Sequence, residues 1–185
     1  MTIDRRSLLA AIPAVALAGE AFAQAKTDPD NTMLITLKDG VVTVRLRPDL
    51  APKHVEQIKT LVRQKFYNGI VFHRVIAGFM AQTGDPRGNG TGGSSLPNIP
   101  AEFSKTPFVR GTLGMARSSS PDSANSQFFI CFDDASFLNG QYTVFGEVVK
   151  GMELVDKIKK GDRNNNGAVT NPDKMIKVRL GSDPA

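Results

Sequence analysis

The most informative segment of the sequence is Phe72–Pro86, which reads FHRVIAGFMAQTGDP. Two apolar runs separated by Ala-Gly predict two short β-strands. Arg74 stands among apolar neighbours in the first strand, and a partly buried cation is costly unless it has a partner or a function. Phe79 and Met80 offer a soft apolar surface, and Gln82 offers a polar group able to orient a guanidinium.

Two stretches further along the chain could complete a pocket around these side chains. They are Gln127–Ile130, with two phenylalanines, and Phe137–Leu138. An apolar pocket with few hydrogen-bond donors suits a proline ring and its amide. The alternative interpretation is a barrel core with one arginine whose charged end reaches solvent. The residues of these stretches leave both interpretations open.

Outside this segment, short strands are predicted along most of the chain. Two β-prone runs around an Asp-Gly pair predict an N-terminal hairpin. The predicted strands are 33–37, 41–46, 71–76, 79–83, 112–116, 127–132, 142–149 and 175–180. Many short strands with few helices favour an antiparallel barrel or a sandwich.

Two helices are predicted. The first begins within 48–52 and ends at Gly69, with Ile58 on its apolar face and His54 on its outward face. The second covers Met152–Lys159. Two helices could close the open ends of a barrel whose interior is already filled with side chains.

Composition excludes several classes of protein. The chain has 185 residues, 41% hydrophobic and 22% charged, which is typical of one soluble globular domain. A single cysteine, Cys131, excludes a disulfide framework and a cysteine-based metal site, and its apolar surroundings predict an unreactive thiol. Two histidines argue against a histidine-rich metal site. The net charge of +5 is scattered, without the basic stripe or motif of a nucleic-acid-binding protein.

The first 25 residues have the parts of a cleavable export signal. Arg5-Arg6 precedes an apolar run over 8–18, and A-x-A sites end at Ala23 and Ala25, either of which suits cleavage. The arginine pair resembles a twin-arginine signal, which predicts export to a bacterial periplasm. The apolar run is shorter than the roughly 20 residues that span a bilayer, so stable membrane insertion is not expected.

Two motifs suggest dinucleotide binding or hydrolysis, but the neighbouring residues that either function needs are missing. The run Gly88–Gly93 resembles a dinucleotide-binding pattern, yet no strand precedes it and no helix can follow it directly. His73 and Asp85 suggest a hydrolase, but the run Ser118–Ser120 has no nucleophile-elbow pattern. A lone strand histidine is more typically a structural residue with satisfied hydrogen bonds.

Several segments in one register resemble the cyclophilins, which are cyclosporin-binding peptidyl-prolyl cis-trans isomerases. The segments are Phe72–Pro86, Gly88–Gly93, Gly114–Arg117, Asn125–Ile130 and Val144–Val148. The resemblance covers residues 32–181. It leaves 26–31 as a flexible leader and 182–185 as a C-terminal tail.

The resemblance implies a closed eight-stranded antiparallel β-barrel, capped by two α-helices, with the active groove on its outer face. It implies that Arg74 is catalytic and that Gln82 orients it. The residues implied to wall the proline pocket or meet the substrate backbone are Phe79, Met80, Ala116, Gln127, Phe129 and Leu138.

Three positions depart from the family's usual residues. Phe137 stands where the family often has Trp, Tyr142 where it has His, and Arg117 where it has Asn. We expect Tyr142 to supply a hydroxyl and a ring face, and Arg117 to contribute its backbone carbonyl. Cyclosporin binding is expected to be weak at most.

The expected function is therefore peptidyl-prolyl isomerisation in protein folding, without a metal or a cofactor. Its expected partners are proline-containing peptides and unfolded proteins, and the expected state is a monomer. The alternative is a peptide-binding chaperone, or holdase, whose isomerase activity is incidental. Intact Arg74 and Gln82 favour the enzyme, because a holdase would need only the apolar walls.

Overall fold

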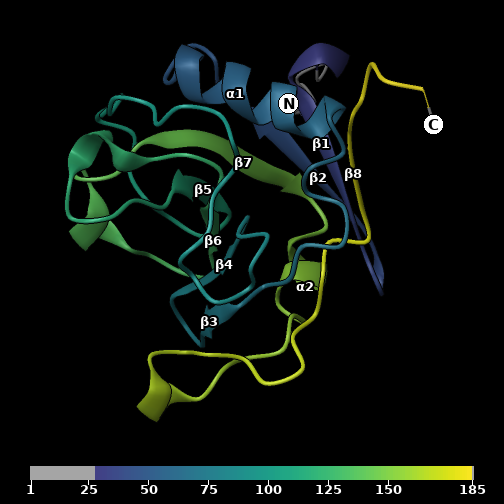
Figure 1. Ribbon diagram of the computed structural model, residues 1–185, viewed down its shortest axis with the longest axis vertical. Coiled ribbons are helices and arrows are strands. Elements are labelled where there is room, and N and C mark those ends of the chain that lie inside the picture. Colours follow the sequence, from purple (N-terminus) through teal and green to yellow (C-terminus); the bar gives the residue numbers. More distant parts are fainter. Residues whose placement is uncertain (1–27, 185) are drawn as a thin grey trace, which may run out of the picture.

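A computed structural model describes residues 28–184 (Figure 1). The predicted export signal and the first two residues of the leader lie outside the described residues. The strands are β1 Thr32–Leu37, β2 Gly40–Leu46, β3 Arg74–Ile76, β4 Met80–Thr83, β5 Thr112–Met115, β6 Phe128–Cys131, β7 Val144–Lys150 and β8 Lys177–Leu180. The α-helices are α1 Pro52–Arg63 and α2 Met152–Val155. Each of the eight predicted strands is present, with ends that differ by up to three residues.

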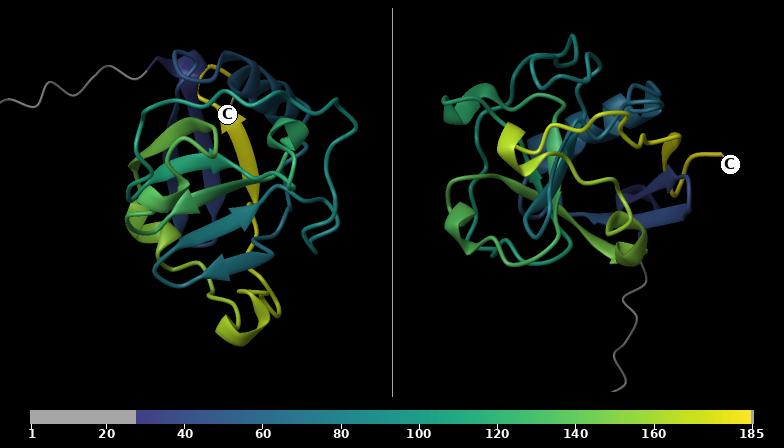
Figure 2. Two further views of the ribbon diagram at one scale, coloured as in Figure 1. Left: turned by 90° about the vertical axis from the view of Figure 1, so that its left-hand side faces the viewer. Right: turned by 90° about the horizontal axis from the view of Figure 1, so that it is seen from below.

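The strands form one antiparallel sheet in the order β3-β4-β6-β5-β7-β2-β1-β8, which curls into a half-barrel (Figures 1 and 2). The expected regular closure between β3 and β8 is not found in residues 28–184. Instead, a loop over 161–169 covers the outer edge of β3, where the Val75 amide donates to the Gly167 carbonyl at 2.8 Å. The segments that precede β3 and β8 in the chain do meet, in an isolated antiparallel bridge between Val71 and Lys174.

Alternation along the strands sends side chains to two separate apolar clusters. Val75, Ala81 and Phe128 point into the curled sheet and join its main core. Met80 and Phe129, at alternate positions, join a second cluster on the opposite face. Since neighbouring residues of a strand face opposite sides, the outer face acquires its own small core. This second cluster positions the candidate site.

Helix α1 ends six residues earlier than predicted, because its C-terminus is capped before Gly69. Lys65 adopts a left-handed φ of 57°. Its amide donates to the Val62 carbonyl, and the Phe66 amide donates to the Leu61 carbonyl. This pair of hydrogen bonds is a Schellman motif, which satisfies the last carbonyls of the helix and turns the chain away.

The prediction that His54 faces outward is wrong. His54 has no exposed surface, and its Nδ1 lies 2.6 Å from Glu102 Oε2. A period of 3.6 residues places His54 on the same stripe as Ile58, so it belongs to the buried face. The Glu102 carboxylate also accepts the amides of Lys53 and His54, capping a helix whose own N-cap side chain makes no hydrogen bond.

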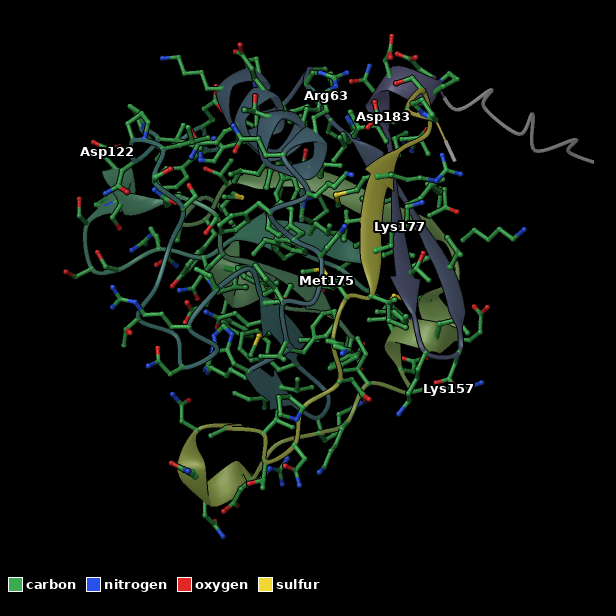
Figure 3. All side chains as sticks on the ribbon, turned by 45° about the vertical axis from the view of Figure 1, so that its right-hand side comes forward. Arg63, Asp122, Lys157, Met175, Lys177 and Asp183 are labelled. Atoms are coloured by element: carbon green, nitrogen blue, oxygen red, sulfur yellow. The ribbon has the colours of Figure 1, made fainter. Side chains whose placement is uncertain are left out.

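Helix α2 is half the predicted length, because the chain tightens after Val155 into turns with i to i+3 hydrogen bonds. Residues 29–31, predicted as part of a flexible leader, form a 3₁₀ turn (η1, Pro29–Asn31) capped by the Asp28 carboxylate. In the predicted C-terminal tail, Asp183 Oδ1 lies 3.6 Å from Nε of Arg63 in α1 (Figure 3).

Within residues 28–184 no helix has both the length and the apolar character needed to cross a bilayer.

Candidate functional site

The candidate site is built on a row of residues that crosses four strands on the outer face of the sheet. The strand register pairs Arg74 of β3 with Gln82 of β4, Gln82 with Phe129 of β6, and Phe129 with Gly114 of β5. A β-carbon added to Gly114 would lie 2.4 Å from Phe129 Cζ and 2.6 Å from Phe108 Cε1. Glycine at this position therefore leaves room for the aromatic ring to lie across β5.

Three residues of this row, Arg74, Gln82 and Phe129, line a cavity of about 430 Å³. All but one of the site residues predicted from the sequence line it, together with one that was not predicted, Gln141. The lining residues are Arg74, Phe79, Met80, Gln82, Ala116, Arg117, Phe129, Phe137, Leu138, Gln141 and Tyr142. The remaining predicted residue, Gln127, lines a neighbouring cavity of about 400 Å³ that shares Gln82, Ala116 and Arg117.

The guanidinium of Arg74 is held by three neutral oxygen atoms. Its Nη1 donates to Gln82 Oε1 at 3.1 Å, a contact that the predicted orienting role of Gln82 would need. Its Nε donates to the backbone carbonyl of Asn166 at 3.0 Å, and its Nη2 donates to Asn166 Oδ1 at 3.0 Å. Burial lowers the pKa of Arg74, and the coulombic effect of Tyr142 opposes this. Among the described residues no carboxylate forms an ion pair with Arg74.

Gln82 belongs to a chain of amides that continues to the glycine-rich loop. Gln82 Nε2 donates to Gln127 Oε1 at 2.9 Å, and Gln127 Nε2 donates to the carbonyls of Gly90 and Gly92. The loop in turn is folded around the Asp85 carboxylate, which accepts the amides of residues 87, 89 and 90. The loop amides are thus directed at a carboxylate of the same chain. This geometry supports the interpretation of the glycine run as a structural loop.

Phe129 forms one of the apolar walls of the cavity. It is 5% exposed, stacks on Phe108 with ring centroids 5.8 Å apart, and meets the edge of Tyr142 at 5.9 Å. Met80 and Leu138 are buried beside it in the same cluster. These side chains leave an apolar concavity next to a charged donor.

The cavity is also lined by the three residues that depart from the usual cyclophilin pattern, Arg117, Phe137 and Tyr142. The Arg117 guanidinium lies 4.5 Å above the centre of the Tyr142 ring, and Arg117 Nη2 donates to the Gln141 carbonyl at 3.0 Å. Phe137 is 63% exposed and tilts against Phe79 with ring centroids 5.2 Å apart. Arg117 is expected to contribute its backbone carbonyl, and its side chain packs on the ring of Tyr142, another residue that lines the cavity.

The remaining candidate residues do not form a second reactive centre. His73 is buried, and neither ring nitrogen has a hydrogen-bond partner among the described residues, so the expectation of a satisfied histidine is wrong. Burial lowers the pKa of His73 and favours its neutral form. Burial also raises the pKa of the Cys131 thiol to about 12, as expected of an unreactive cysteine. No group of three metal-ligating side chains gathers within residues 28–184.

Sequence reasoning did not identify Asn166, Gln141 or Phe108 as part of the site. The Asn-Gly dipeptide at 166–167 indicates a turn, but nothing in it connects that turn to Arg74, 92 residues away. Gln141 and Phe108 lie in loops without a periodic pattern. Their places follow only from how those loops fold over the outer face.

Comparisons with known proteins agree with this geometry. Residues 32–180 match the family described as cyclophilin type peptidyl-prolyl cis-trans isomerase/CLD. A probable peptidyl-prolyl cis-trans isomerase of Brucella suis is 62% identical over 190 residues, covering 96% of this chain and 97% of that protein.

Two solved structures share the fold. Cyclophilin AquaCyp293 from Hirschia baltica has a TM-score of 0.77 and 27% identity, over 86% of this chain and 77% of that one. A cyclophilin-type isomerase of Cryptosporidium parvum, crystallised in the presence of the dipeptide Ala-Pro, has a TM-score of 0.75 and 28% identity, over 82% and 99% of the two chains.

Proposed function

The chain belongs to the cyclophilin-type peptidyl-prolyl cis-trans isomerases, and on this premise we propose that Arg74 is the group through which it accelerates rotation about X-Pro bonds. One observation carries the assignment. The Arg74 guanidinium lines a cavity that also has apolar walls, Met80, Phe129 and Leu138, and it is held only by neutral oxygen atoms of the described residues. Its positive charge is therefore available to a bound peptide.

The physics of the peptide bond explains why such a donor accelerates the reaction. Rotation about an X-Pro bond must break amide resonance, with a barrier of about 18–20 kcal/mol. In the twisted state the prolyl nitrogen becomes pyramidal and gains a lone pair. A guanidinium directed at this nitrogen binds the twisted state more strongly than either planar state, which lowers the barrier. The reaction requires no nucleophile and no net proton transfer.

The apolar walls would anchor the proline ring while the preceding carbonyl turns. Met80, Phe129 and Leu138 supply this surface within reach of Arg74. The related isomerase crystallised in the presence of Ala-Pro supports proline-containing peptides as ligands of this cavity. Unfolded proteins, which expose such peptides, are the proposed clients.

The assay that tests this proposal follows the cis-to-trans relaxation of an X-Pro peptide in the presence of the wild type and of an Arg74→Ala variant. The holdase alternative is not favoured, because the curated relatives are named as isomerases. A holdase would need the apolar walls, but it would not need a guanidinium held by Gln82 and Asn166.

We expect weak cyclosporin binding, which Phe137→Trp should strengthen. The phenyl ring lacks the indole N–H that a tryptophan would offer the ligand, and a lost hydrogen bond costs about 0.5–1.5 kcal/mol. Phe137 lines the cavity and is 63% exposed, so a larger ring can be accommodated there. Calorimetric titration of both proteins measures the difference. Equal affinities would show that Phe137 does not cause weak binding.

We also propose export through the twin-arginine route, which the pair Arg5-Arg6 and the apolar run over 8–18 support. Changing Arg5 and Arg6 to lysine should abolish periplasmic accumulation of the processed protein in fractionated cells. A strain lacking the twin-arginine translocase is the control and should behave in the same way. N-terminal sequencing of the exported wild type should begin at Gln24 or Lys26. Unchanged export of the double variant would contradict this route.

A further inference from the structure

We propose that Asn166 is a positioning residue for isomerisation, which holds the Arg74 guanidinium in its working orientation. The inference rests on the proposed function of Arg74. Asn166 follows the 3₁₀ turn η4 (Arg163–Asn165) and meets Arg74 from a loop 92 residues further along the chain.

Asn166 holds one edge of the guanidinium with two oxygen atoms. Its backbone carbonyl accepts from Arg74 Nε at 3.0 Å, and its Oδ1 accepts from Arg74 Nη2 at 3.0 Å. Two parallel hydrogen bonds to adjacent nitrogens fix the plane of a guanidinium as well as its position. The single bond from Nη1 to Gln82 leaves rotation about that bond free. Gln82 alone is therefore insufficient to orient Arg74.

The three hydrogen bonds leave part of the guanidinium free for substrate. An arginine has five N–H donors, two on each terminal nitrogen and one on Nε. Gln82 and Asn166 occupy three of them, one on each nitrogen. Among residues 28–184, one N–H on each terminal nitrogen thus has no acceptor. Because both acceptor residues are neutral, they orient Arg74 without neutralising the charge that a pyramidal prolyl nitrogen would attract.

The strand that carries Arg74 also holds the loop that carries Asn166. The Val75 amide donates to the Gly167 carbonyl at 2.8 Å, and the Val75 carbonyl accepts from the Gly161 amide at 2.8 Å. In Figure 1 this loop is the yellow segment beside β3. These two backbone hydrogen bonds hold Asn166 in place relative to Arg74. Asn166 has a left-handed φ of 50°, a conformation that asparagine and glycine adopt more readily than other residues.

The sharpest test replaces Asn166 by glycine, which tolerates the left-handed backbone and keeps the carbonyl but removes Oδ1. We expect kcat for an X-Pro peptide to fall by roughly three- to tenfold, with KM changed less than about twofold. Asn166→Asp, which restores an acceptor oxygen, should recover part of kcat. It should not recover all of it, because a carboxylate partly neutralises the Arg74 charge.

The matched control is Asn171→Gly. Asn171 lies in the same part of the chain, is exposed, and has a left-handed φ of 52°, but it makes no hydrogen bond to Arg74. This variant should keep wild-type kcat. A second control places Asn166→Gly in an Arg74→Ala background, where a residue that acts only through Arg74 should cause no further loss.

The outcomes separate this inference from the proposed function. If Arg74→Ala loses activity but Asn166→Gly behaves like Asn171→Gly, the role of Asn166 is wrong and that of Arg74 stands. If Asn166→Gly lowers kcat equally with and without Arg74, Asn166 does not act through the arginine. If Arg74→Ala keeps full activity, both proposals fail. Thermal unfolding of each variant verifies that the proteins being compared are folded.

Discussion

Arg74→Ala is expected to lower kcat/KM for an X-Pro peptide at least about tenfold while the fold stays intact. A hydrogen bond from a charged donor contributes about 1.5–3 kcal/mol, or roughly 10–150-fold in rate. Arg74 lies on the cavity wall, outside the main core, so its removal should leave the circular dichroism spectrum unchanged. The measurement is cis-to-trans relaxation, for which the uncatalysed reaction takes about 10–100 s.

Two further variants make the Arg74 result specific. Arg74→Lys should recover only part of the activity, because an ammonium lacks the planar fork that Gln82 and Asn166 hold. Arg179→Ala is the matched control, since Arg179 is a half-buried strand arginine whose guanidinium donates to backbone carbonyls at the far end of the sheet order. It should keep wild-type kcat/KM. Wild-type activity in Arg74→Ala would instead favour the holdase interpretation.

Phe129→Ala is expected to weaken substrate binding and to destabilise the protein by about 3–5 kcal/mol. The ring is 5% exposed and packs against Phe108 and Tyr142, so its loss leaves a cavity in the outer cluster. Denaturant titration measures the free energy of unfolding, and KM for the X-Pro peptide measures binding. Phe129→Leu, which fills part of the space, should be folded and show a smaller increase in KM.

The matched control for this prediction is Phe137→Ala. Phe137 lines the same cavity, but 63% of the residue is exposed, so its removal should change the free energy of unfolding by less than about 1 kcal/mol. A loss of stability in Phe137→Ala equal to that in Phe129→Ala would contradict the buried-wall role of Phe129. An unchanged KM in Phe129→Ala would contradict its role in binding the proline ring.

Much of the fold can be predicted from local patterns. The Asp-Gly pair at 39–40 marks the first hairpin, and β-prone runs between glycine, proline and serine stretches mark the other strands. These signals are reliable because turn chemistry and side-chain alternation act between near neighbours. The early end of α1 was missed, because it depends on Lys65 adopting a left-handed conformation that its residue type does not favour.

Part of the candidate site could likewise be predicted from local sequence. Arg74, Phe79, Met80 and Gln82 lie on one hairpin, so their proximity follows from the sequence that encodes it. Resemblance to a known family added the residues contributed by later segments. The row from Gln82 through Phe129 to Gly114 required the strand order, which places β6 between β4 and β5.

Local sequence patterns thus account for the strands and for the first hairpin of the site, and the family resemblance led to the proposed role of Arg74. Which loop residues contact the strands and the helix became clear only from the tertiary structure. It brought Asn166 to Arg74 and Glu102 to His54, both over long separations in the chain. It also left the curled sheet without a regular ladder between β3 and β8 in the described residues. Single polar residues in loops have no periodicity, so their partners depend on how distant segments pack and leave no local pattern to read.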